Sequence, residues 1–313
     1  MRHFLRDDDL TPAEQSAVLD RAAALKADRF AERPLEGPQG VAIIFDKPTL
    51  RTQLSFSVGV AELGGFPMVV DGNLAQIGTR ESIADVARVL GRQVSAVVWR
   101  TYGQDRIEDM AQYAGVPVVN ALTDDFHPCQ ILADLLTVRE HKGRLPGLTM
   151  TYVGDAANNM AHSYLLGGAT AGLHVRVAGP ATHQPDPRIV QRAAEIASQT
   201  GGSASVLDDA VEAVEGADVV ITDTWMSMGQ EQEAAERKGA SSPFAPFAVD
   251  QELLAHAADD AIVLHCLPAY RGFEISAEVI DGPQSVVWDE AENRLHAQKA
   301  LLAFLLDRAR DDG

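Results

Sequence analysis

The sequence predicts an α/β protein with two doubly wound parallel-sheet domains and a C-terminal helix that packs back on the first domain. Apolar, β-rich runs alternate with helix-period segments along almost the whole chain, which is typical of parallel sheets wrapped by helices. The apolar runs are continuous rather than alternating, which favours sheets buried on both faces. A single core stops growing at about 250–300 residues, so a chain of 313 residues is expected to form two domains.

The expected elements follow one another in this order. Strands are predicted at 40–45, 66–71, 96–99, 116–120, 148–153, 174–178, 218–222 and 261–265. Helices are predicted from 52 to the paired glycines at 64 and 65, which supply a left-handed cap, and over 81–92, 128–141, 187–199 and 289–308.

The domain boundary is expected in the turn-rich segment 142–147. We therefore expect a first domain over 1–143, a second over 144–288, and the returning helix within 289–313. The segment 224–246 is long and rich in Ser, Gly, Glu and Pro, which indicates a functional loop.

Composition narrows the class of protein. The net charge of -19 argues against nucleic acid as a partner, because phosphate backbones select basic surfaces. No apolar run approaches the ~20 residues that span a bilayer, and the N-terminus has no apolar signal core, so no membrane association is expected. Counting leaves a disulfide between Cys129 and Cys266 open, but reduced thiols in a cytoplasmic protein are the favoured interpretation.

The first motif that indicates chemistry joins a strand to a helix over Phe45-Asp-Lys-Pro-Thr-Leu-Arg-Thr52. Pro48 suits a first helical turn, Thr49 and Thr52 can cap, and exposed N–H groups at a helix start form an anion site. Arg51 adds a bidentate phosphate donor. An ordinary capped helix with a surface arginine explains the segment equally well.

Further polar residues follow other predicted strands. Arg100 ends one strand, where ligands of doubly wound sheets collect. His127 enters a helix within His127-Pro-Cys-Gln130, and on its own it is better explained as a core histidine bonded to a carbonyl. No second ligand stands at helical spacing from His127, so no metal site is expected.

The segment Thr151-Tyr-Val-Gly-Asp-Ala-Ala-Asn-Asn-Met160 has the strand-glycine-helix layout of a nucleotide fold but lacks the Gly-x-Gly-x-x-Gly fingerprint. Asn158 and Asn159 in the turn favour recognition of a small zwitterion, with a plain helix cap as the alternative. Asp223, at another strand end, could hold an α-ammonium group. Arg294, in the last helix, could be a solvated charge. Each signal is weak alone, and their shared position at strand ends makes the set informative.

Taken in order, these motifs resemble the ornithine carbamoyltransferase family over essentially the whole chain. The resemblance rests on His-Pro-Cys-Gln, Asp-x-x-x-Ser-Met-Gly, His-Cys-Leu-Pro and Asn-Arg-x-His. It implies transfer of a carbamoyl group from carbamoyl phosphate to the side-chain amine of L-ornithine, giving L-citrulline and phosphate. It also implies a cytoplasmic homotrimer that needs no metal and no organic cofactor.

The resemblance assigns a role to each matching position. Carbamoyl phosphate would be bound by Thr49, Leu50, Arg51, Thr52, Gln76, Arg100, His127, Gln130, Cys266, Leu267 and Arg294. Ornithine would be bound by Asn159, Asp223, Ser227 and Met228. The catalytic set would be Arg100, His127, Cys266 and Arg294, with Cys266 positioning the ligands rather than attacking. Gln76 matches a position that reaches the neighbouring subunit's site.

The phosphate motif departs from the family's usual Ser-Thr-Arg-Thr-Arg, since it reads Thr49-Leu-Arg-Thr-Gln53. Leu50 loses a hydroxyl, and Gln53 replaces a cation. Tyr270 also differs from the usual His or Phe. We therefore hypothesise altered affinity for carbamoyl phosphate, as in a specialised or inhibitor-tolerant enzyme.

Other functions compete with this one. The acceptor could be lysine, diaminopropionate, an acylated ornithine or an antibiotic precursor, and putrescine ranks low because it lacks the groups that Asn159 and Asp223 would bind. A non-catalytic binding or regulatory protein on the same fold is an alternative from another class. A nucleotide-dependent oxidoreductase is disfavoured by the missing glycine fingerprint.

Overall fold

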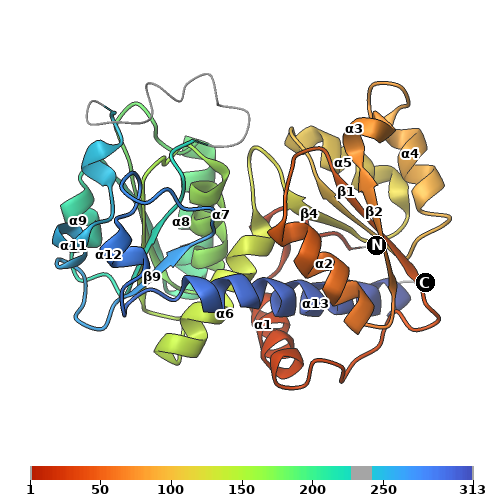
Figure 1. The fold of residues 1–313 in the computed structure, drawn as a ribbon, viewed down its shortest axis with the longest axis horizontal. Helices are drawn as coiled ribbons and strands as arrows, with labels where there is room; N and C mark the ends of the chain where they lie inside the picture. Colours follow the sequence, from red (N-terminus) through yellow and green to blue (C-terminus); the bar gives the residue numbers. More distant parts are fainter. Residues whose placement is uncertain (1, 227–241, 312–313) are drawn as a thin grey trace. The chain divides into compact units, whose positions relative to one another are not determined.

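The structure is a computed structural model that describes residues 2–226 and 242–311. The chain forms two compact units (Figure 1). Unit 1 comprises Met1–Leu136 and Glu292–Gly313, and unit 2 comprises Thr137–Ala291. Each unit contains one fully parallel sheet, which confirms the predicted fold class. The domain bounds at 143 and 288 stay a prediction.

Unit 1 is built on a four-stranded sheet in the order β2-β1-β3-β4. Its strands are β1 (Gly40–Phe45), β2 (Phe66–Asp71), β3 (Ala96–Arg100) and β4 (Val118–Leu122). The two inner strands are almost fully buried because both faces of the sheet are covered by helices, which explains their unbroken apolar sequences.

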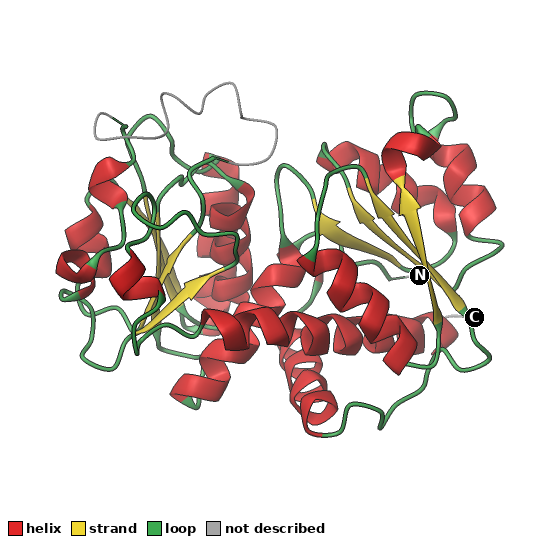
Figure 2. Ribbon diagram, in the orientation of Figure 1, coloured by secondary structure: helices red, strands yellow, loops and turns green. Residues whose placement is uncertain are grey.

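The helices of unit 1 cover both faces of this sheet (Figures 1 and 2). They are η1 (Asp7–Asp9), α1 (Pro12–Ala27), α2 (Arg51–Glu62), α3 (Gly72–Ala75), α4 (Ile83–Leu90), α5 (Gln104–Ala114), most of α6 (Pro128–Lys142) and most of α13 (Val287–Asp311). The last helix lies along α2, where Gly59 gives room: a Cβ at that position would come within 3.0 Å of the Lys299 side chain. Arg21 of α1 also pairs with Asp307 of α13 at 2.8 Å. The predicted return of the last helix to the first sheet is confirmed.

Unit 2 has a five-stranded sheet in the order β7-β6-β5-β8-β9. Its strands are β5 (Thr149–Val153), β6 (His174–Ala178), β7 (Ser203–Leu207), β8 (Val219–Thr222) and β9 (Ile262–His265). Its helices are α7 (Asn159–Thr170), α8 (Pro187–Thr200), α9 (Ala210–Val214), η3 (Ala245–Phe247), α11 (Gln251–Leu254) and α12 (Ala277–Ile280). Residues of α9, α11 and α12 form one core cluster with β5, β8 and β9, and Figure 1 shows α7 and α8 on the opposite side of the sheet from α9 and α11.

Some local elements were not predicted. The edge strand β7 was missed because its sequence, Ser-Ala-Ser-Val-Leu, is short and only partly apolar. Helix α1 was missed although Thr11 and Glu14 form a capping box at its start. The predicted stop of α2 is confirmed: Gly64 has φ +85°, and the Gly65 N–H donates to the Val60 carbonyl at 2.9 Å.

Among the described residues, no helix is both long and apolar enough to cross a membrane.

Candidate active site

The residues of unit 1 that were predicted to bind phosphate follow β1 and β3, the two strands between which the strand order of the sheet reverses. From β1 the chain goes outward to β2 and then crosses to β3 and β4 on the other side. The loops that leave β1 and β3 therefore diverge, and the carboxyl ends of these neighbouring strands form a crevice typical of ligand sites. Phe45, which ends β1, pairs with Arg100 at the end of β3. The topology thus brings the motif 45–52 beside Arg100.

The start of α2 differs from the expectation drawn from its sequence. Leu50 occupies the N-cap position in a helical conformation, and no side chain caps the helix. Pro48 and Thr49 precede the helix, and Thr52 lies inside it. The prediction that Thr49 and Thr52 cap the helix is wrong, because the first turn begins later than the proline suggested. The N–H groups of this turn are left for another acceptor.

Three arginines act electrostatically on His127. The histidine is 5% exposed, and its pKa lies well below the usual 6.5, first because of burial and then because of the positive charges of Arg294, Arg100 and Arg51. The imidazole is therefore neutral at pH 7. Two of the arginines, Arg100 and Arg294, are themselves only 6% and 3% exposed. Such a concentration of buried positive charge suits a dianion as ligand.

Arg294 is held by neutral partners from distant parts of the sequence. Its Nη1 donates to Gln130 Oε1 at 2.5 Å, and its Nη2 donates to Thr52 Oγ1 at 3.1 Å. Gln130 in turn donates through Nε2 to Asp134 Oδ1 at 2.8 Å. Thr52, Gln130 and Arg294, which were predicted separately, therefore form one buried cluster on α2, α6 and α13.

A second network ties together the loops at the strand ends, and sequence reasoning missed it. Thr101 donates through Oγ1 to Asp46 Oδ2 at 2.6 Å, and the Arg106 Nε donates to Thr101 Oγ1 at 2.9 Å. Lys47 pairs with Asp124, which precedes His127 by three residues. The only available signal was Asp46-Lys47, a charged pair directly after a buried strand.

Gln76 lies on a different loop of unit 1. It is exposed and adopts φ +52°, and its carbonyl accepts the N–H groups of Thr79 and Arg80 at 3.0 Å. The following residue is anchored to the strand-end network, because Arg106 donates through Nη2 to the Ile77 carbonyl at 2.9 Å. The expected reach of Gln76 into a neighbouring subunit stays a prediction.

Unit 2 repeats the same topological feature. Its chain runs outward from β5 to β6 and β7, then crosses to β8 and β9, so the sheet changes direction between β5 and β8. Asn158 and Asn159 follow β5, and Asp223 follows β8. Asn158 has a structural role as the N-cap of α7, where it accepts the Ala161 N–H at 2.9 Å, and its amide donates to the Tyr152 hydroxyl at 2.8 Å. Asn159 is half-buried at the first turn of α7.

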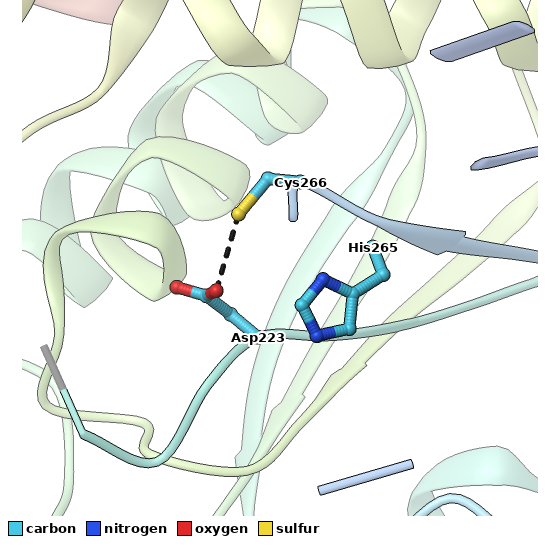
Figure 3. Close-up of side chains that lie close together, drawn as sticks. All are labelled: Asp223, His265 and Cys266. Carbon is cyan, nitrogen blue, oxygen red and sulfur yellow. Dashed lines mark hydrogen bonds between the residues drawn. The ribbon is translucent and has the colours of Figure 1, made fainter. Parts of the chain in front are cut away.

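Asp223 and Cys266 form the centre of the unit 2 site (Figure 3). The Cys266 thiol donates to Asp223 Oδ1 at 3.1 Å, and the Thr224 N–H donates to the same oxygen at 2.7 Å. Burial raises the pKa of Asp223 above its usual value. A buried carboxylate in this state gains from a cationic partner such as an ammonium group. Leu267 follows directly and is half-buried.

The ligand atoms of Asp223, His265 and Cys266 lie within 4.8 Å of one another, a spacing that could hold a metal ion. Both ring nitrogens of His265 already have hydrogen-bond partners: Nδ1 accepts the Leu267 N–H at 2.9 Å, and Nε2 lies 3.2 Å from Glu274 Oε1. A metal would have to displace one of them. The arrangement therefore fits a hydrogen-bonded site better than a metal site.

Two predicted residues, Ser227 and Met228, lie outside the described residues, as does most of the expected functional loop 224–246. Both cysteines of the chain are free thiols, Cys129 buried and Cys266 half-buried.

Comparison with known proteins assigns both units to one family. Residues 2–140 match the carbamoyl-P binding domain of aspartate/ornithine carbamoyltransferase, and residues 146–305 match its Asp/Orn binding domain. The chain is 64% identical over 305 residues to an ornithine carbamoyltransferase of Clavibacter sepedonicus, covering 97% of this chain and 98% of that one. It is 60% identical over 311 residues to the ornithine carbamoyltransferase of Leifsonia xyli, covering 99% of both.

A solved structure agrees with these matches. Ornithine carbamoyltransferase from Pyrococcus furiosus superposes with a TM-score of 0.93 at 46% identity, covering 98% of this chain and 97% of that chain. The two domain matches together include every strand of both sheets. The chain belongs to the ornithine carbamoyltransferase family.

Proposed function

We propose that this protein transfers the carbamoyl group from carbamoyl phosphate to the side-chain amine of L-ornithine, with L-citrulline and phosphate as products. The observation that carries the proposal is the convergence of Arg51, Arg100 and Arg294 on a buried, neutral His127 in unit 1. A doubly charged phosphate compensates this positive charge, and guanidinium groups bind phosphate in a bidentate manner.

The reaction needs an electrophile, a leaving group and a free amine. The neutral ornithine amine attacks the carbamoyl carbon and forms the C–N bond. The bond from that carbon to the phosphate oxygen breaks, and phosphate leaves with the electron pair and takes up the proton that the amine loses. Arg100 and His127 donate hydrogen bonds to the carbamoyl oxygen, where negative charge develops in the tetrahedral intermediate. A neutral imidazole serves here as a donor and does not need to exchange a proton.

The departing phosphate is stabilised by Arg51, Arg294 and the uncapped first turn of α2. Thr49, Thr52 and Gln130 complete the binding site, with Thr52 and Gln130 also orienting Arg294. No protein nucleophile is required. The Cys266 thiol, which donates to Asp223, positions the amino acid in this mechanism.

Ornithine is distinguished from a simple amine by its α-ammonium and carboxylate groups. We assign the ammonium group to Asp223, whose burial raises its pKa and so favours a cationic partner. Asn159, at the other side of the switch point in unit 2, donates its side-chain amide N–H to the carboxylate. Ser227 and Met228 belong to this part of the proposal by family resemblance.

We propose that the protein is a homotrimer. An exposed apolar stripe on unit 1 supports a homotrimer. It runs from the N-cap of α2 along the helix and consists of Leu50, Leu54 and Val58, which are 66%, 55% and 39% exposed. Their spacing of four residues puts them on one face of the helix. A second copy of the chain would cover this face. Light scattering should give the mass of three chains, and Leu54→Glu should lower it, whereas Val211→Glu on unit 2 should not.

The cytoplasm is the proposed location. The two free cysteines support it, because thiols persist in reducing compartments.

The decisive experiment is a carbamoylation assay with a panel of amines. Purified protein and carbamoyl phosphate are incubated with ornithine, lysine, 2,3-diaminopropionate, N-acetylornithine or putrescine, and ureido products are identified by mass while phosphate release is followed. We expect ornithine to have the highest kcat/KM. Faster carbamoylation of another amine would reassign the acceptor. Absence of phosphate release above the uncatalysed rate with every amine would reject the proposal and favour a non-catalytic function.

A further inference from the structure

Leu267 has an unusual backbone conformation. It is one of two non-glycine residues with positive φ in the described part of the chain, at φ +56°. A leucine in the left-handed region carries a steric cost that surrounding contacts must offset. Leu267 directly follows Cys266, whose thiol bonds to Asp223, so the strained residue borders the amino-acid half of the proposed site.

The contact that holds Leu267 comes from His265. The Leu267 N–H donates to His265 Nδ1 at 2.9 Å, which requires that this nitrogen carry no proton. The proton of the neutral ring is then on Nε2, which donates to Glu274 Oε1 at 3.2 Å. The Leu267 N–H can only donate, so it fixes the direction of its own bond to His265 Nδ1 and, through the tautomer, that of the bond from His265 Nε2 to Glu274.

The pair is rigidly supported. His265 is 0% exposed and Glu274 is 1% exposed. Glu274 Oε1 also accepts the Tyr270 N–H at 2.5 Å, so the carboxylate fixes both the imidazole and the turn that follows Leu267. The His265 N–H donates to Glu290 Oε2 at 2.8 Å, and His265 pairs with Thr222 at the end of β8.

We propose that His265 and Glu274 are positioning residues for carbamoyl transfer: they hold the Leu267 peptide in its left-handed conformation beside Asp223 and Cys266. Glu274 selects the Nε2–H tautomer, and that tautomer presents Nδ1 to the Leu267 N–H. This inference rests on the proposed function, since it assumes that the Leu267 backbone contacts the substrates. It assigns a role to two buried ionisable residues that take no direct part in the proposed reaction.

Two substitutions at one position separate positioning from packing. In His265→Asn the side-chain oxygen falls near Nδ1 and can still accept the Leu267 N–H. In His265→Gln the amide falls near Nε2, so the bond to Glu274 survives and the bond to Leu267 is lost. We expect His265→Gln to lower kcat about tenfold, the factor that corresponds to one lost hydrogen bond.

The Michaelis constants provide a second readout. With His265→Gln, the KM for ornithine, for carbamoyl phosphate or for both should rise at least about threefold, because Leu267 borders the amino-acid half of the site and is itself assigned to carbamoyl phosphate. His265→Asn should retain most of the activity. A merely structural role would lower the amount of active enzyme equally in both variants and leave both KM values unchanged, and that result would overturn the inference.

A backbone test covers the case in which His265→Gln folds poorly. Glycine adopts positive φ without steric cost. In a Leu267→Gly background, His265→Gln should therefore cost clearly less than the tenfold seen with leucine. An equal loss in both backgrounds contradicts the proposal.

The tautomer can be measured without any assay. In 15N-histidine NMR spectra of the wild-type protein, with His265→Asn used for assignment, His265 should be neutral with the proton on Nε2. A proton on Nδ1 would overturn the hydrogen-bond scheme whatever the activity. If the wild-type protein has the expected tautomer but forms no citrulline, the proposed function fails and the catalytic role of the pair fails with it, whereas the scheme itself stands.

Discussion

Arg294→Gln tests whether the buried cluster of unit 1 binds carbamoyl phosphate. Glutamine removes the charge but keeps an amide donor, so the loss measures charge rather than mere contact. In the wild-type protein Arg294 donates to Gln130 at 2.5 Å and to Thr52 at 3.1 Å, and it is 3% exposed. These partners orient the guanidinium within the buried cluster of unit 1.

The expected loss follows from these contacts. A hydrogen bond to a charged group contributes about 1.5–3 kcal/mol, and a bidentate guanidinium makes two of them with phosphate. Two such bonds contribute about 3–6 kcal/mol, and the amide donor that glutamine keeps recovers part of this. A net loss of about 3–4 kcal/mol corresponds to a fall in kcat/KM for carbamoyl phosphate of about 10²–10³-fold. The KM for ornithine should change much less, because the amino-acid site is assigned to residues of unit 2.

The same substitution should change the titration of His127. Burial is the main cause of its low pKa, and Arg294 is the next. Removing one positive charge should raise the pKa of His127, although burial should still keep it below 6.5. The titration of His127, followed by NMR of its ring, should therefore move to higher pH than in the wild-type protein.

The assay is citrulline formation under varied carbamoyl phosphate, with Arg271→Gln as the matched control. Arg271 is an exposed arginine paired with Asp281 at 2.7 Å, and its substitution should leave both KM values unchanged. If Arg294→Gln keeps kcat/KM for carbamoyl phosphate within about threefold of wild type at an unchanged melting temperature, the reasoning about the arginine cluster is refuted.

Three further outcomes are expected. Restoring Thr at Leu50 and Arg at Gln53 should lower KM for carbamoyl phosphate, because the uncapped start of α2 gains a hydroxyl and a cation; an unchanged KM would reject the hypothesis of altered affinity. Lys299→Met should lower the free energy of unfolding in urea by about 3 kcal/mol, because Lys299 is fully buried and pairs with Glu62 at 2.7 Å. A loss below about 1 kcal/mol would show that Arg29, the other partner of Glu62, compensates its buried charge without Lys299. Burial raises the pKa of Cys129 to about 12, so alkylation mapped by mass spectrometry at pH 8 should label Cys266 first; prior labelling of Cys129 would contradict the buried placement.

The sequence by itself determined the fold class and most of the elements, because their signals are local. Buried strands such as β1 appear as unbroken apolar runs, and the end of α2 is marked by Gly64 at φ +85°. The order of strands and helices was enough to put Arg100 and Asp223 at the carboxyl ends of strands. The edge strand β7 was not predicted from the sequence, because a half-exposed strand has few apolar residues to mark it.

Only the tertiary structure decided which of these residues meet. Arg294 and Gln130 are 164 positions apart, and nothing local indicates that one orients the other. The start of α2 at Arg51, with Leu50 as its N-cap, and the bonding of His265 to both Glu274 and Leu267 likewise became visible only in the folded chain. The physical reason is that periodicity and capping act over one or two turns, whereas the convergence of charge and the direction of a buried hydrogen bond depend on how distant segments pack.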